Sequence, residues 1–122
     1  MDELIARLVA NVGVDRETAE KAVGIILDFL VKEGPPDKEQ PLIDKLPGAQ
    51  ALIQAQQASD TGGGMFAMGG LMGAGTKMMA AGLSMGQVQA VTKEVIAFSR
   101  EKAGEDAVGE IVGSIPGLSQ FV

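Results

Sequence analysis

The sequence contains no His, Cys, Trp or Tyr, and its only aromatic residues are four Phe. Without His and Cys, the chain lacks the usual near-neutral general base, the thiolate nucleophile and the common ligands of zinc, haem and iron–sulfur clusters. A disulfide scaffold is excluded as well, because it needs cysteine pairs. We therefore expect a protein that is not an enzyme and that binds no cofactor and no metal.

Basic residues are also scarce, since 10 Lys and Arg stand against 16 Asp and Glu and give a net charge of −6. Nucleic-acid binding depends on clustered Lys and Arg that neutralise phosphates, and the sequence has no such cluster. We expect no nucleic-acid partner. The segment Met1-Asp2-Glu3-Leu4 is acidic where a signal peptide would be basic, so the expected location is the cytoplasm.

Apolar residues make up 46% of the 122 residues, which is enough to form a core in one domain of this length. Because aromatic residues are few, that core has to consist of Leu, Ile, Val, Ala and Met. Side chains of this kind suit thin, closely packed helices. The composition therefore favours an all-α fold.

Two segments near the N-terminus have the apolar spacing of amphipathic helices. The apolar stripe of the first consists of Leu4, Ile5, Leu8, Val9 and Val12. Gly13 ends this helix, and Asp15 is the expected N-cap of the next one. The apolar face of the second consists of Ala19, Ala22, Val23, Ile26, Leu27, Leu30 and Val31.

Proline and glycine divide the following part of the chain. The triplet Gly34-Pro35-Pro36 predicts the end of the second helix, because proline lacks the amide donor and restricts the residue before it. A short third helix is predicted over Pro41 to Leu46, with Pro41 in its first turn. After a break at Pro47-Gly48, residues 49–58 are predicted to be helical.

An offset of 69 residues aligns the first part of the sequence with the last and places residues 1–53 on residues 70–122 without a gap. The matched pairs include Gly13 and Gly82, Phe29 and Phe98, Asp37 and Asp106, Pro47 and Pro116, and Gly48 and Gly117. We predict one compact domain over 1–122, in which two similar units of three to four helices are related by a pseudo-twofold axis. Residues 54–69 are the predicted linker.

The second unit has helix signals of its own. Ser84-Met85-Gly86-Gln87 has the form of a capping box and predicts a helix from Met85 to Lys102. Asp37 and Asp106, which are matched at the offset of 69, are the predicted caps of the third helix in each unit. In all, six to eight helices are expected.

Two proline-glycine motifs flank a segment rich in Gly and Met. They are Leu46-Pro47-Gly48-Ala49-Gln50-Ala51-Leu52-Ile53 and Ile115-Pro116-Gly117-Leu118-Ser119-Gln120-Phe121-Val122. In this arrangement the sequence resembles small bacterial proteins of unknown function, the VcgC/VcgE-like group. The resemblance covers most of the chain and implies a helical fold and a bacterial origin, but no activity and no site residues.

The central segment is nearly free of charge. Residues 46–92 carry only Asp60 and Lys77, while six of the seven Met and nine of the 17 Gly lie within residues 62–86. Glycine costs about 1 kcal/mol relative to Ala inside a helix, so several helical glycines need compensation from close packing. The preferred interpretation is a tight crossing of helices.

Two other interpretations of this segment are less favoured. Residues 70–77 approach a phosphate-binding loop, but Thr76 precedes Lys77 where that loop needs Lys before the hydroxyl, and no strand-like run comes first. Residues 65–85 are long enough to span a membrane, but they contain a charge, recurring glycine and no aromatic belt. We expect neither nucleotide binding nor membrane insertion.

Methionine side chains are flexible and can pack against varied partners. Met65, Phe66 and Met68 follow a Gly-rich link over residues 59–64, which makes them candidates for partner contact. The leading hypothesis is a non-catalytic module for protein interaction or self-association, with a protein partner or a homodimer. The alternative is a carrier of an apolar small molecule in a Met-lined pocket between the two halves.

Overall fold

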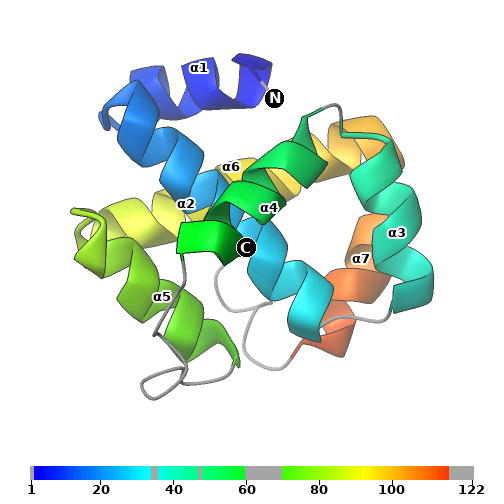
Figure 1. The fold of residues 1–122 in the computed structure, drawn as a ribbon. Helices are drawn as coiled ribbons and strands as arrows, with labels where there is room; N and C mark the ends of the chain where they lie inside the picture. Colours follow the sequence, from blue (N-terminus) through cyan, green and yellow to red (C-terminus); the bar gives the residue numbers. More distant parts are fainter. Residues whose placement is uncertain (1, 34–35, 47, 60–69, 116–122) are drawn as a thin grey trace.

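The computed structural model of the chain describes residues 2–33, 36–46, 48–59 and 70–115. Within these residues every regular element is a helix, which confirms the all-α prediction. Seven helices follow one another in the described chain (Figure 1): α1 Asp2–Asn11, α2 Arg16–Glu33, α3 Pro36–Asp44, α4 Ala49–Ser59, α5 Gly70–Ala80, α6 Met85–Ala103 and α7 Glu105–Ser114.

The third helix differs from its prediction over Pro41 to Leu46. It begins five residues earlier, at Pro36, and Pro41 lies inside it rather than in its first turn. Pro36 suits the first helical position, where its missing N–H needs no partner. Pro41 removes the N–H that would bond to the carbonyl of Asp37, but both residues are exposed and water can solvate that carbonyl.

The prediction that Asp37 and Asp106 are N-caps is wrong. Each is the second residue of its helix, because α3 begins at Pro36 and α7 at Glu105. The N-cap of α7 is Gly104, whose φ is 96° and which has no side chain to accept a hydrogen bond. A carboxylate in the first turn of a helix still interacts favourably with the partial positive charge there.

The predicted helix breaks at Gly13 and Gly82 are confirmed. Both glycines adopt a positive φ, 84° and 110°, which other residues rarely tolerate. The capping box after Gly82 is confirmed too. The Ser84 N–H donates to Oε1 of Gln87 over 2.9 Å, and the Gln87 N–H donates to Oγ of Ser84 over 3.2 Å.

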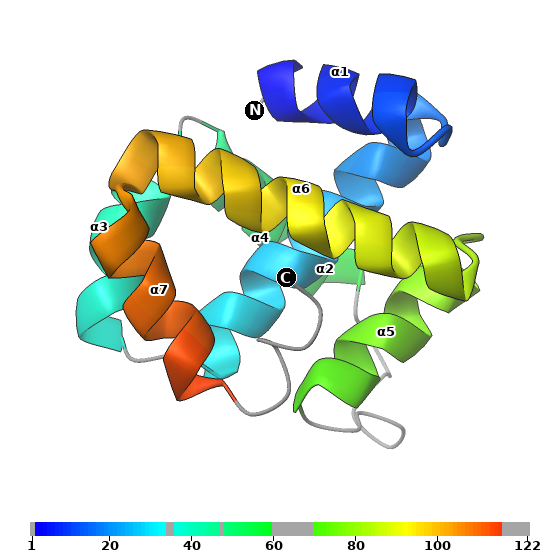
Figure 2. The same cartoon turned by 180° about the vertical axis from the view of Figure 1, so that it is seen from behind.

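The two longest helices, α2 and α6, pack against each other and organise the rest of the fold (Figures 1 and 2). Helix α1 contacts both of them, and so does α5. Helices α3 and α7 lie side by side at one end of the pair, and α4 covers α2 on the side away from α6. As a result, α2 has neighbours on more of its surface than α6 has.

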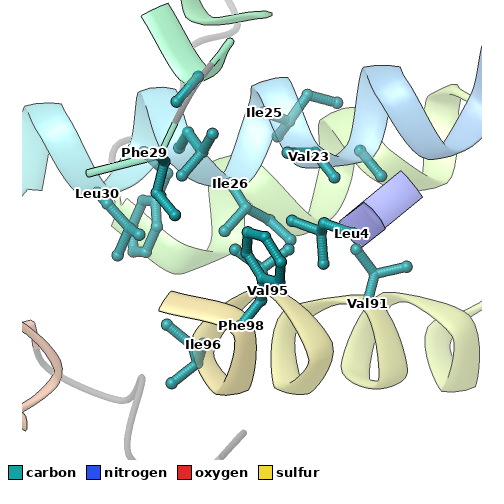
Figure 3. Packing of buried hydrophobic residues seen from close by; sticks show 14 of the residues in the cluster. Leu4, Val23, Ile25, Ile26, Phe29, Leu30, Val91, Val95, Ile96 and Phe98 are labelled. Carbon is teal, nitrogen blue, oxygen red and sulfur yellow. The ribbon is translucent and has the colours of Figure 1, made fainter. Parts of the chain in front are cut away.

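A continuous apolar core joins these helices. Figure 3 shows Leu4 of α1 and Ile26 of α2 lying opposite Val95 and Phe98 of α6. Among the described residues, Phe29 and Phe98 are the only aromatic members of the core. The aliphatic core that the composition predicts is therefore present.

Two residues assigned to apolar helix faces lie at the edge of those faces. Val9 is 40% exposed and Val31 is 37% exposed, whereas Leu8 and Leu30 beside them are buried. An apolar stripe on a helix is roughly 100° wide, so its outer members reach the boundary of what neighbouring helices cover. Both valines therefore mark the boundary of the predicted apolar faces.

Candidate functional site

The predicted contact residues Met65, Phe66 and Met68 lie outside the described residues. The predicted linker over 54–69 is described only in its first part, where residues 54–59 belong to α4. The site can therefore be built only from the C-terminal part of the segment that is rich in Gly and Met. That part comprises α5 and the beginning of α6.

Two methionines of this part face outward. Met79, near the end of α5, is 48% exposed, and Met85, the first residue of α6, is 56% exposed. Met78 has the opposite placement, since it is 1% exposed and belongs to the core. We call the exposed residues of this turn the methionine corner: Met79, Ala80, Gly82, Ser84 and Met85.

Sequence reasoning did not single out Met79 and Met85, although the signal was present. At the offset of 69, Met78 matches Val9, which belongs to the apolar stripe of the first helix, whereas Met79 matches Ala10, which does not. Met85 matches the charged residue Arg16. The alignment thus placed both Met79 and Met85 outside the predicted apolar stripes.

The methionine corner has no charge of its own. Lys77 lies two residues before Met79, in the last turn of α5, where a cation interacts favourably with the partial negative charge of the helix end. No acidic residue occurs between Asp60 and Glu94, so all 16 acidic residues of the chain lie outside residues 61–93. The five residues of the corner are thus uncharged, in a chain whose net charge is −6.

A second cluster consists of charged residues of α1 and α6 that form ion pairs. Nη1 of Arg7 donates to Oε2 of Glu101 over 2.7 Å, and Nε of Arg7 lies 3.6 Å from Oε2 of Glu94. The guanidinium also lies 5.8 Å from the ring centroid of Phe98. The hydrogen bond to Glu101 is the main reason that the pKa of Arg7 is raised further above its ordinary value.

A second cation also lies near this ring. Nζ of Lys102 lies 5.4 Å from the centroid of Phe98 and 3.8 Å from Oε2 of Glu3. Phe98 itself is 2% exposed, so the two cations lie near a ring that belongs to the core. The cluster connects α1 to α6, and both of its cations have carboxylate partners within the chain.

The buried hydroxyl groups of α6 are also used within the chain. Oγ1 of Thr92 donates to the carbonyl of Val88 and Oγ of Ser99 donates to that of Val95, each over 2.8 Å. Such a bond satisfies a buried hydroxyl group within the helix. The burial of Thr92 and Ser99 is therefore explained by hydrogen bonds within α6.

Across the residues that the structure describes, no group of three or more acidic side chains is placed to hold a metal ion. In the same residues, none of the helices combines the length and the apolar character that crossing a membrane requires. No family model matches the chain, and comparisons with curated proteins and with solved structures found no match. The resemblance to VcgC/VcgE-like proteins stays a prediction.

Proposed function

We propose that this chain is a non-catalytic module that associates with a second copy of itself through the methionine corner. The observation that carries the proposal is the exposure of Met79 and Met85 in a stretch of the chain, residues 78–92, that carries no charge. Single exposed apolar residues are common on proteins, but two large ones at the same turn suit a contact surface. The corner also continues along the chain from the Met-rich segment in which partner contact is predicted.

Charge favours a second copy as the occupant. Each chain carries a net charge of −6, so two copies repel each other over most approaches. The corner lies in the longest stretch without acidic residues, from 61 to 93. Contact through this surface keeps the acidic residues of the two copies apart, whereas a basic partner would be drawn to the acidic surfaces elsewhere.

The expected affinity is modest. Complete burial of a Met side chain contributes about 1.5–3 kcal/mol, so covering the exposed half of each contributes about 1 kcal/mol. A symmetric contact buries Met79 and Met85 of both copies, four side chains in all, and gains about 4 kcal/mol from them. Because the entropic cost of association is of similar size or larger, a weak dimer that is populated only at high protein concentration is expected.

Analytical ultracentrifugation over micromolar to millimolar protein concentrations tests the proposal. We expect a reversible dimer for the natural chain and weaker association for the double variant Met79→Gln/Met85→Gln. Two controls are matched: Met79→Leu/Met85→Leu keeps the corner apolar, and Val9→Gln changes an exposed apolar residue on α1. A natural chain that stays monomeric at millimolar concentration contradicts the proposal, as does equal association of the Gln and Leu double variants.

We also propose that the fold consists of two copies of one unit, residues 1–53 and 70–122. Adding 69 to the bounds of α1, α2 and α3 gives 71–80, 85–102 and 105–113, which agree within one residue with α5, α6 and α7. Exchanging α1 with α5 and α2 with α6 also preserves the contacts among these four helices, because α1 and α5 each contact both long helices. Both observations support a pseudo-twofold relation.

Backbone hydrogen bonds at the helix ends support the same register. Three bonds of the first unit recur in the second at the offset of 69. The Val12 N–H bond to the Leu8 carbonyl matches that of Ala81 to Lys77, and the Ala19 bond to Asp15 matches that of Val88 to Ser84. The Leu46 bond to Ile43 matches that of Ile115 to Val112. An experimental structure tests the repeat. One rotation of about 180° is expected to superpose α1–α3 on α5–α7. A rotation far from a half turn contradicts it.

A further inference from the structure

Sulfur in this chain occurs only in its seven methionines, because there is no cysteine. We infer that Met79 and Met85 are sites of oxidation by peroxide, and that their conversion to methionine sulfoxide weakens association through the methionine corner. The second half of this inference rests on the proposed function. The first half depends only on how far each methionine is exposed to solvent.

Exposure separates these methionines from their neighbour in the core. Oxidation of a thioether requires access of the oxidant to sulfur, so susceptibility follows exposure. Met79 and Met85 are 48% and 56% exposed, whereas Met78 is 1% exposed. Met78 and Met79 are adjacent on the same helix, so they differ in burial while sharing their local backbone. Met78 is therefore an internal reference for access.

The chemistry needs only a peroxide as co-reactant. A lone pair of the thioether sulfur attacks one peroxide oxygen, an S–O bond forms and the O–O bond breaks. The second oxygen leaves and is protonated to water, so sulfur loses two electrons and the peroxide gains two. The product is a polar, chiral sulfoxide, and the change is chemically reversible.

The polar product changes the methionine corner but leaves the core intact. An apolar thioether gains free energy when a second copy covers it, whereas a sulfoxide oxygen loses its hydrogen bonds to water there. Association is also expected to hinder oxidation, because a bound second copy covers Met79 and Met85. Oxidation of Met79 and Met85 is therefore expected to slow as protein concentration rises, while that of Met78 stays slow throughout.

Peptide mapping after limited hydrogen peroxide treatment tests the site assignment. Cleavage after Lys77 and Lys93 yields one peptide, residues 78–93, that carries all three methionines, and fragmentation then locates each added oxygen. We expect Met79 and Met85 to react about tenfold faster than Met78, or more. Similar rates for the three residues overturn the inference.

Ultracentrifugation of the same samples tests the consequence. We expect peroxide treatment to raise the dissociation constant of the dimer about tenfold or more, and to have no effect on Met79→Leu/Met85→Leu. Selective oxidation without weaker association overturns the inference and leaves the proposed function standing. If peroxide treatment also weakens association of the Leu double variant, the effect belongs to another methionine, and the inference is overturned as well. Absence of a dimer before treatment overturns the proposed function and, with it, the second half of the inference.

Discussion

Replacing Ser84 by Ala tests whether the capping box contributes to folding as its geometry implies. In the natural chain, Oγ of Ser84 accepts from the Gln87 N–H over 3.2 Å, and Oε1 of Gln87 accepts from the Ser84 N–H over 2.9 Å. Ser84→Ala removes the first of these bonds directly. One of the N–H groups at the start of α6 then has no partner within the helix.

The expected loss can be estimated from these bonds. Replacing a Ser N-cap by Ala costs about 1 kcal/mol of stability. The unfolding entropy is about 2.1 cal/mol/K per residue, which gives about 0.26 kcal/mol/K for 122 residues. A loss of about 1 kcal/mol therefore lowers Tm by about 4 °C. Gln87→Ala, which removes the other bond, is expected to cost less because the Ser84 hydroxyl can still cap.

Thermal unfolding followed by far-ultraviolet circular dichroism measures the effect, and Ser114→Ala is the matched control. Oγ of Ser114 donates to the carbonyl of Glu110 over 2.8 Å, so both variants remove one exposed hydrogen bond between a side chain and the backbone. Only the bond of Ser84 satisfies a helix-start N–H. Equal changes in Tm for the two variants would refute the capping argument.

Four further predictions concern backbone, core and charge. Gly109→Ala and Gly113→Ala should each raise the free energy of unfolding by about 0.5–1 kcal/mol, because a Cβ at either site meets nothing within 4 Å, and thermal melts check this. Gly82→Ala should lower stability by about 1 kcal/mol or more, since its φ is +110°; a change of the same sign as at Gly109 contradicts the argument. Leu27→Ala should cost about 2–5 kcal/mol in chemical denaturation, because Leu27 is fully buried, and a loss below this range would contradict that placement. Arg7→Gln should cost about 1 kcal/mol at low salt and less at about 1 M NaCl, where screening is strong, and a cost independent of salt would refute the ionic account.

The sequence predicted helix ends best where glycine or a capping residue marks them. The breaks at Gly13 and Gly82 and the start of α6 after Ser84 depend on backbone freedom and on hydrogen bonds within a few residues. Such signals act locally, so they can be recognised without knowledge of the fold. The start of α3 was mistaken because Pro36 and Pro41 are both compatible with a first turn, and the sequence alone did not distinguish them.

The candidate site was harder to predict, because its placement depends on contacts between distant segments. Arg7 and Glu101 are 94 residues apart in the chain, and no local pattern brings them together. The exposure of Met79 depends on where α5 packs, although its match with Ala10, outside the apolar stripe of the first helix, gave a signal that was available. A composition rich in Met indicated the region but not which sulfur atoms reach the surface.

The difference between the two long helices can be traced to α4, which covers α2 on the side away from α6 (Figures 1 and 2). Gly24 and Ile25 are buried in α2, and in the proposed register they match Lys93 and Glu94 of α6, which reach solvent. Figure 3 shows Ile25 pointing away from α6, toward the side that α4 covers. Where no helix covers the matching side of α6, charged residues occupy it, and Glu94 uses this position to pair with Arg7. The two proposed units thus differ in composition at those positions where their surroundings differ.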